Sequence, residues 1–165
     1  MAGSLALMVA RFSAGQVNDA EALAATAERL RDAALELAAE DGMVYGRLLA
    51  LEREGSEGEL EAARLAVARV PLAMVEIAAE LAPLLARLCV HGKVALRGDA
   101  LSGLRLLQGA AAAAAGLVRI DAQQLASPHR AELLGELEGA EREVAGCGAD
   151  GSAPQPACSP REPAQ

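Results

Sequence analysis

One carboxylate stands out in this chain because it interrupts an apolar helical pattern. Between residues 18 and 53, positions recur at alternating steps of four and three, which keeps them on one face of a helix. Eight of these nine positions are apolar, and the exception is an aspartate: Leu23, Ala27, Leu30, Ala34, Leu37, Asp41, Val44, Leu48 and Leu51. A buried carboxylate is costly unless it is paired or protonated. Asp41 is therefore the first candidate for acid–base or cation-stabilising chemistry, unless the helix bends at Gly42 and leaves it in solvent.

Two further polar residues, Tyr45 and Asp99, are candidates for the functional site. Tyr45 lies one turn after Asp41 on the same side and is placed to donate a hydrogen bond to it, although ordinary packing explains it equally well. Asp99 follows Gly98 at the predicted start of a helix, where an aspartate serves as N-cap. Capping is compatible with function, because a helix start presents backbone N–H groups to a ligand. Asp41 and Asp99 are the two candidate catalytic residues.

Four further residues are candidates for substrate contacts. Lys93 and Arg97 lie in a polar segment between two apolar helices, which predicts either a solvated loop or a loop that binds an anionic ligand. Gln108 stands within an apolar stripe and is a candidate for a buried polar contact. Arg119, near the end of the same helix, also fits a simple interaction with the helix dipole.

The composition excludes several classes of protein and site. The chain has 165 residues, a net charge of −8, one Phe, one Tyr and no Trp, so it lacks the basic surface and stacking aromatics of a nucleic-acid binder. Its three cysteines and two histidines have no spacing typical of a zinc site or a disulfide framework. The apolar N-terminus is too short to span a bilayer. We expect a cytoplasmic protein without a bound metal, partnered by neither nucleic acid nor membrane.

The elements that must position these residues are all helical. Periodicity predicts helices over residues 2–13, 18–54, 56–88, 99–121 and 127–145, with breaks in the third near Val70 and Ala82, before Pro71 and Pro83. Ser-x-x-Glu and Asn-x-x-Glu capping boxes begin at Ser56 and Asn18, and Ser127-Pro128 reads as an N-cap followed by an N1 proline. The prediction is an all-α, up-and-down bundle of five to six helices in one domain, residues 1–145, with a flexible tail at 146–165.

Five segments, in this order, resemble the formiminotransferase-cyclodeaminase/methenyltetrahydrofolate cyclohydrolase family over roughly residues 2–145. They are AGSLALMVARFS, LRDAALELAAEDGMVYGRLLAL, ARVPLAMVEIAAELAPL, HGKVALRGD and GAAAAAAGLVRID. The resemblance implies a helical homodimer with a folate pocket near the dimer interface. It also implies either loss of ammonia from a 5-formimino group or hydrolysis of a 5,10-methenyl bridge. Tetrahydrofolate would be the one-carbon carrier, and no metal would be required.

The resemblance assigns roles to the candidate residues. Asp41 matches the acidic position of the family's second-helix motif, and Asp99 matches the aspartate that closes its loop. Asp41 would stabilise or deprotonate at the reacting carbon, and Asp99 would orient the pterin or a water. The anionic glutamate tail would contact three cations: Lys93, Arg97 and Arg119.

The chain also departs from the family pattern. The family's preceding helix and Pro-Gly-Gly-Gly-Ser turn have no counterpart before Met1, so the sequence reads as N-terminally truncated and divergent. Family asparagine and serine positions carry other residues here: Lys93, Ala95, Gly98 and Leu117. Two alternatives to a folate enzyme therefore stay open. The chain is a catalytically degenerate binding or assembly protein, or its scaffold acts on another imine or amidine in specialised metabolism.

Overall fold

The computed structural model describes residues 1–148 and confirms the all-α prediction. Within this range the chain forms five α-helices and one short 3₁₀ turn, and no strand. The elements are α1 (Ala2–Phe12), α2 (Ala20–Glu54), α3 (Glu57–His91), η1 (Val94–Leu96), α4 (Arg97–Ala122) and α5 (Ser127–Ala145).

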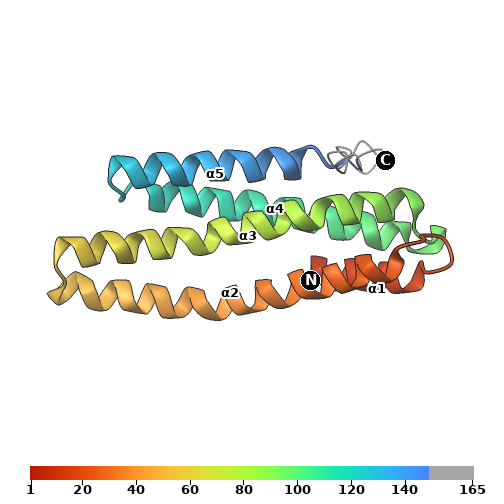
Figure 1. Cartoon of the computed structure of the whole chain (residues 1–165), viewed down its shortest axis with the longest axis horizontal. Coiled ribbons are helices and arrows are strands. Elements are labelled where there is room, and N and C mark those ends of the chain that lie inside the picture. Colours follow the sequence, from red (N-terminus) through yellow and green to blue (C-terminus); the bar gives the residue numbers. More distant parts are fainter. Residues whose placement is uncertain (149–165) are drawn as a thin grey trace, which may run out of the picture.

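Two long antiparallel helix pairs make up the bundle. The pair α2–α3 and the pair α4–α5 run along the same axis, and α3 lies between them, in contact with α2, α4 and α5 (Figure 1). The short helix α1 packs between α2 and α4 along only part of their length. Met1 consequently lies midway along the bundle (Figure 1), and the faces of α2 and α4 that flank α1 continue beyond its start.

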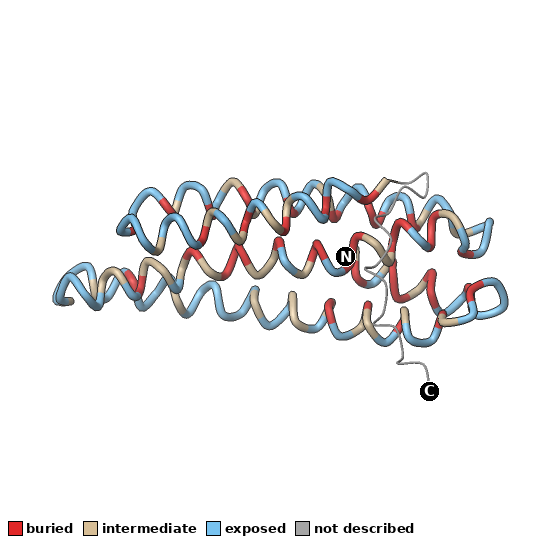
Figure 2. Tube along the Cα trace, turned by 45° about the horizontal axis from the view of Figure 1, so that its top comes forward, coloured by how far each residue is buried: buried red, intermediate tan, exposed pale blue. Residues whose placement is uncertain are grey.

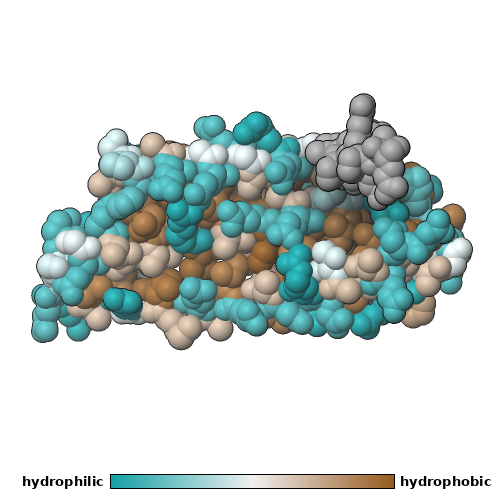
Figure 3. Space-filling view, viewed as in Figure 1, coloured by the Kyte–Doolittle hydropathy of each residue, from teal (hydrophilic) through white to brown (hydrophobic). Residues whose placement is uncertain are grey.

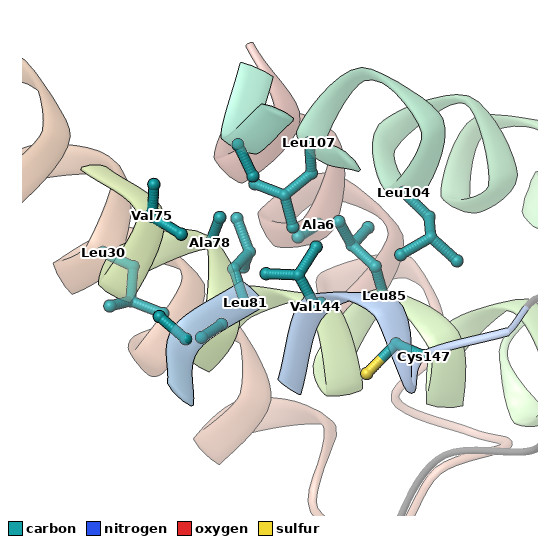
Figure 4. Packing of buried hydrophobic residues seen from close by; sticks show 14 of the residues in the cluster. Ala6, Leu30, Val75, Ala78, Leu81, Leu85, Leu104, Leu107, Val144 and Cys147 are labelled. Atoms are coloured by element: carbon teal, nitrogen blue, oxygen red, sulfur yellow. The ribbon is translucent and has the colours of Figure 1, made fainter. Parts of the chain in front are cut away.

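The core is built from leucines and small residues. Figure 4 shows Leu81 and Leu85 of α3 packed with Leu104 and Leu107 of α4. Gly103 allows α4 to approach closely, because an added Cβ would lie 3.0 Å from Leu85 Cδ2 and 3.4 Å from Leu5 Cβ. Burial is not uniform along the molecule: the α2–α3 end beyond α1 is much more exposed (Figure 2). The dense part of the core therefore lies where α1, α3 and α4 meet.

The predicted helix boundaries were partly correct. The Ser56–Glu59 capping box is confirmed, with Ser56 N–H donating to Glu59 Oε2 at 2.9 Å, and α2 ends at Gly55 as predicted. The Asn18 capping box is wrong, because α2 begins at Ala20 with Asp19 as its N-cap residue. The predicted Asp99 cap is also wrong, since α4 begins two residues earlier and Asp99 lies in its first turn.

The start of α5 and the packing of α1 also differ from prediction. Ser127 is the first residue of α5 and Ala126 is the N-cap residue, so Pro128 follows one position later than expected. Phe12 was expected on the packed side of the first helix, but its side chain is 64% exposed. The chain at Cys147, within the predicted tail, is buried against the bundle, and the rest of that tail from residue 149 lies outside the described residues.

Neither proline breaks α3, contrary to the prediction. The helix runs without interruption over 35 residues although Pro71 and Pro83 each remove one helical hydrogen bond. Pro71 is buried and Pro83 is half-buried, so both rings contribute apolar packing area. Packing of α3 against four other helices outweighs a proline cost of about 3 kcal/mol per site.

Candidate functional site

Asp41 lies on the predicted face of α2, but it is exposed rather than buried. Every other member of the predicted seam is buried or half-buried. The reason is the short reach of α1: four of the five buried residues of α2 lie in its first eleven positions, and only Leu48 is buried further on. Asp41 therefore stands on a part of the core-facing surface that no helix of the described chain covers.

A second carboxylate, Asp121 near the end of α4, lies close enough to Asp41 for their charges to interact. Burial raises the pKa of Asp121 above its ordinary value, and the negative charge of Asp41 raises it further. Neither carboxylate has a salt-bridge partner among residues 1–148. Two carboxylates with different environments are suited to divide acid and base roles, the half-buried one keeping its proton more readily. The pair Asp41–Asp121 is the candidate site.

Asp121 was not among the residues singled out from the sequence. The available signal was weaker than for Asp41, a carboxylate one turn after Val118 at the end of the apolar stripe of this helix. Because it lies near the end of the predicted helix, its sequence position alone is equally typical of a solvent-exposed residue without a role in a site. Only the packing of α2 and α4 around α3 shows that it belongs with Asp41.

An exposed aromatic or apolar side chain lies one helical turn from each member of the pair. Tyr45 is 53% exposed and makes no hydrogen bond to Asp41 within the described chain, so the predicted link between them is not formed. Leu117, four residues before Asp121 on α4, is 54% exposed. Together they provide apolar surface near two unpaired carboxylates, a combination suited to a planar organic cation.

Asp99 and the basic loop residues lie at the other end of α4. Asp99 precedes Asp121 by 22 residues, which corresponds to about 33 Å along a helix. Lys93 and Arg97 have exposed side chains without a carboxylate partner in the described part of the chain. The loop is held at its backbone: Lys93 N–H donates to the Oγ of the buried Ser13 at 2.9 Å. Within one chain, these residues do not share a site with Asp41.

Gln108 and Arg119 both contact the C-terminal part of the chain. The Gln108 side chain accepts a hydrogen bond from Arg105 at 2.9 Å and donates one to the Cys147 carbonyl at 3.1 Å. Arg119 forms an ion pair with Glu141 of α5 at 2.5 Å, which raises the pKa of the guanidinium. Both side chains thus fasten α4 to α5 and its C-terminal extension.

A groove of about 380 Å³ lies between α2 and α3, lined by Leu37, Glu40, Val70 and Glu76 among others. Arg69, also in its lining, is paired with Glu132 and Glu136 of α5, so this groove faces the α5 side. Burial raises the pKa of Glu76, and the nearby charge of Glu136 adds to the effect. Figure 3 shows apolar residues along the hollow between α2 and α3 on this side.

No group of three or more His, Cys, Asp or Glu residues within 1–148 is arranged to hold a metal.

Comparison with known proteins identifies a family and a solved structure that share this architecture. The family model for formiminotransferase-cyclodeaminase matches residues 1–136. Among solved structures, the formiminotetrahydrofolate cyclodeaminase of Thermotoga maritima is similar, with 28% sequence identity and a TM-score of 0.84. That match covers 89% of this chain and 77% of the other. No curated protein gives a significant match.

Proposed function

Because the chain belongs to the formiminotransferase-cyclodeaminase family, we propose that it is an enzyme acting on a one-carbon adduct of tetrahydrofolate. The observation that carries the proposal is the carboxylate pair Asp41 and Asp121, in which burial, and then the charge of Asp41, raises the pKa of Asp121. The formimino and methenyl groups are both amidinium-like cations, and a carboxylate beside such a carbon stabilises its charge. The 28% identical relative supports the formimino substrate.

The two carboxylates divide the proton transfers of ammonia loss between them. N10 of the folate attacks the formimino carbon, and Asp41 accepts the proton that N10 releases. Asp121, which holds its proton more readily, donates it to the departing amine. The C–N bond to that amine then breaks, leaving ammonia and the 5,10-methenyl cation. Asp41 has then gained one proton and Asp121 has lost one, so the pair as a whole has lost none. Proton exchange with water returns both carboxylates to their starting states.

Tyr45 is placed to contact the ring system, one turn from Asp41 on the same helix face. Hydrolysis of the methenyl bridge is the second reaction that this pair supports, with Asp41 as base toward water. The tetrahydrofolate glutamate tail is anionic, and the cations proposed for it are Lys93 and Arg97 at the start of α4. We propose that the protein acts as a homodimer in the cytoplasm, with folate as substrate and no metal.

A binding protein of the same fold, or an enzyme for another imine or amidine, is the alternative, favoured by the replaced loop positions Lys93, Ala95 and Gly98. Measuring ammonia and methenyltetrahydrofolate from the formimino substrate tests the choice. The matched variants are Asp41→Asn, Asp121→Asn and the control Glu36→Gln, an exposed carboxylate on α2. If both aspartate variants lose turnover and the control keeps it, the result supports the proposal that the protein is a folate enzyme. Absence of turnover in the unmodified protein with either folate substrate rejects it.

A further inference from the structure

The turn between α4 and α5 lacks the local caps that commonly close helix ends. It lies at the end of the bundle where α3 begins, and it follows Asp121, the penultimate residue of α4, almost directly (Figure 1). No glycine stands among the four residues that link the two helices, and the N-cap residue of α5, Ala126, makes no side-chain cap hydrogen bond. Since helix ends leave carbonyl and N–H groups without a partner in the helix, other side chains must satisfy the backbone of this turn.

Arg130 of α5 closes the end of α4. Its Nε donates to the carbonyl of Ala122 at 2.9 Å, and its Nη2 donates to the carbonyls of Gln123 at 3.1 Å and Leu125 at 2.8 Å. Three of the four carbonyls that follow Asp121 along the chain therefore accept hydrogen bonds from one guanidinium group. The positive charge of this group is also favourable at the C-terminal end of a helix dipole.

Glu61 of α3 closes the start of α5. Its Oε1 accepts the N–H of Ala126 at 2.8 Å and lies 3.0 Å from Nδ1 of His129. Both contacts lower the pKa of Glu61, and the contact with His129 is the larger cause. Glu61 thus supplies, from another helix, the acceptor that Ala126 lacks.

Asp121 belongs to the part of α4 that this turn holds in place. The Asp121 carbonyl accepts a hydrogen bond from Gln124 N–H at 3.0 Å, inside the segment that Arg130 bridges. If the turn opened, the last turn of α4 would fray and its side chains would gain contact with water. The raised pKa of Asp121 has two causes, burial and then the charge of Asp41. Arg130 is not among these causes, so its link to Asp121 runs through the backbone.

We propose that Arg130 and Glu61 are positioning residues for Asp121. By closing the two helix ends that meet at this turn, they keep the last turn of α4 formed and hold Asp121 half-buried beside the charge of Asp41. Neither residue contacts the substrate in this account. The role of Asp121 as the acid of the reaction rests on the proposed function, whereas the effect of Arg130 and Glu61 on its burial does not.

Carbon-13 NMR titration of the Asp121 carboxyl tests the positioning. Arg130→Gln and Glu61→Ala should each lower the pKa of Asp121 toward its ordinary value near 3.8, because an open turn lets water reach the carboxyl. Loss of a nearby positive charge alone would raise the pKa instead. Arg130→Lys keeps the charge but loses the planar fork of donors, so it should lower the pKa as well.

Two matched variants serve as controls. Glu61→Gln keeps an acceptor oxygen for Ala126 N–H and should stay close to the parent titration. Arg142→Gln removes an exposed arginine of α5 whose Nε donates only to a carbonyl of its own helix, that of Glu138 at 3.1 Å. It should leave the Asp121 titration unchanged. Circular dichroism at the temperature of the titration checks that each variant is folded, and Glu61→Ala and Arg130→Lys decide the question if Arg130→Gln is not.

Turnover of the formimino substrate separates this inference from the proposed function. In Arg130→Gln and Glu61→Ala, kcat should fall by about 10-fold to 100-fold with little change in KM. The basic limb of the pH profile of kcat, which reports the proton held by the acid, should also move to lower pH. A residue that only stabilised the fold would lower the Tm without moving that limb. If the Asp121 titration shifts as expected but the unmodified protein has no turnover with either folate substrate, the proposed function alone fails. An unchanged or raised pKa of Asp121 in the folded Arg130 and Glu61→Ala variants overturns the positioning role, whatever the activity of the unmodified protein.

Discussion

Asp121 of α4 keeps its proton more readily than an ordinary aspartate, and part of the reason is the charge of Asp41 on α2. The two residues are 80 positions apart in the chain, and their charges interact because α2 and α4 both pack along α3. Burial is the larger cause of the raised pKa, and Asp41 adds to it. The raised pKa of Asp121 therefore has one cause in its own burial and one in a neighbouring helix.

Removing the charge of Asp41 should lower the pKa of Asp121. In Asp41→Asn the contribution of burial remains, so we expect the pKa of Asp121 to fall but to stay above its ordinary value. Carbon-13 NMR titration of the labelled aspartate carboxyls measures this directly. Glu36→Gln, which removes an exposed charge elsewhere on α2, should leave the Asp121 titration in place. An unchanged titration in Asp41→Asn would mean that the two carboxylates are independent.

Asp121→Asn should stabilise the fold at neutral pH while it impairs the proposed reaction. A carboxyl whose pKa is raised by folding contributes stability below its unfolded pKa, near 3.8, and loses that contribution as pH rises through the folded pKa. Above that range the ionised Asp121 is a cost that asparagine avoids. We expect a gain on the order of 0.5 kcal/mol at pH 7, declining toward zero below pH 4. Urea unfolding at several pH values checks this, and a loss of stability at pH 7 would contradict it.

The docking of α1 should depend on Gly3. An added Cβ there would meet Arg31 Cβ at 3.0 Å and Arg31 Cα at 3.3 Å, and a backbone atom cannot move aside easily. Gly3→Val should destabilise the fold by about 1–3 kcal/mol through this crowding. The matched control is Gly58→Val, also the second residue of a helix, where nothing lies within 4 Å of an added Cβ. Equal destabilisation by both variants in thermal unfolding would contradict the close approach of α1 and α2.

The start of α2 should show a pH-dependent link to α3. Both carboxylate oxygens of Asp19 accept hydrogen bonds from Arg87 at 2.6 Å, and this contact lowers the pKa of Asp19. A lowered pKa gives stability that is present above the unfolded pKa, near 3.8, and is lost as pH falls through the folded pKa. Arg87→Gln should therefore lower the Tm at pH 7, and the difference from the parent should shrink below pH 3. Arg53→Gln, an exposed arginine without a carboxylate partner among residues 1–148, should have no such pH-dependent effect.

The sequence predicted the helices well because their signals are local. The apolar spacing, the Ser56 capping box and Gly55 each act within one or two turns, and all three are confirmed. The predicted breaks at the prolines of α3 were wrong, because a proline's cost is local while the compensating contacts come from four other helices. The same limit applies to Asp41. Its helix face was predicted correctly, but its exposure depends on how far α1 extends along α2, which periodicity does not reveal.

The candidate site was predictable only in part. Asp41 carried its own signal, an acid within an apolar seam, whereas its neighbour Asp121 required the three-dimensional arrangement. Asp99, Lys93 and Arg97 were grouped with Asp41 through the family resemblance, and one chain holds them at the far end of α4.

Turnover of formiminotetrahydrofolate tests the central claim most directly. The unmodified protein should release ammonia and form the methenyl product, followed by its absorbance, faster than the uncatalysed reaction. Asp41→Asn and Asp121→Asn should each reduce kcat by at least about 100-fold, while Glu36→Gln keeps the parent rate. Full activity in both aspartate variants, or no rate above the uncatalysed one in the unmodified protein with this or the methenyl substrate, would contradict a folate enzyme built on this pair.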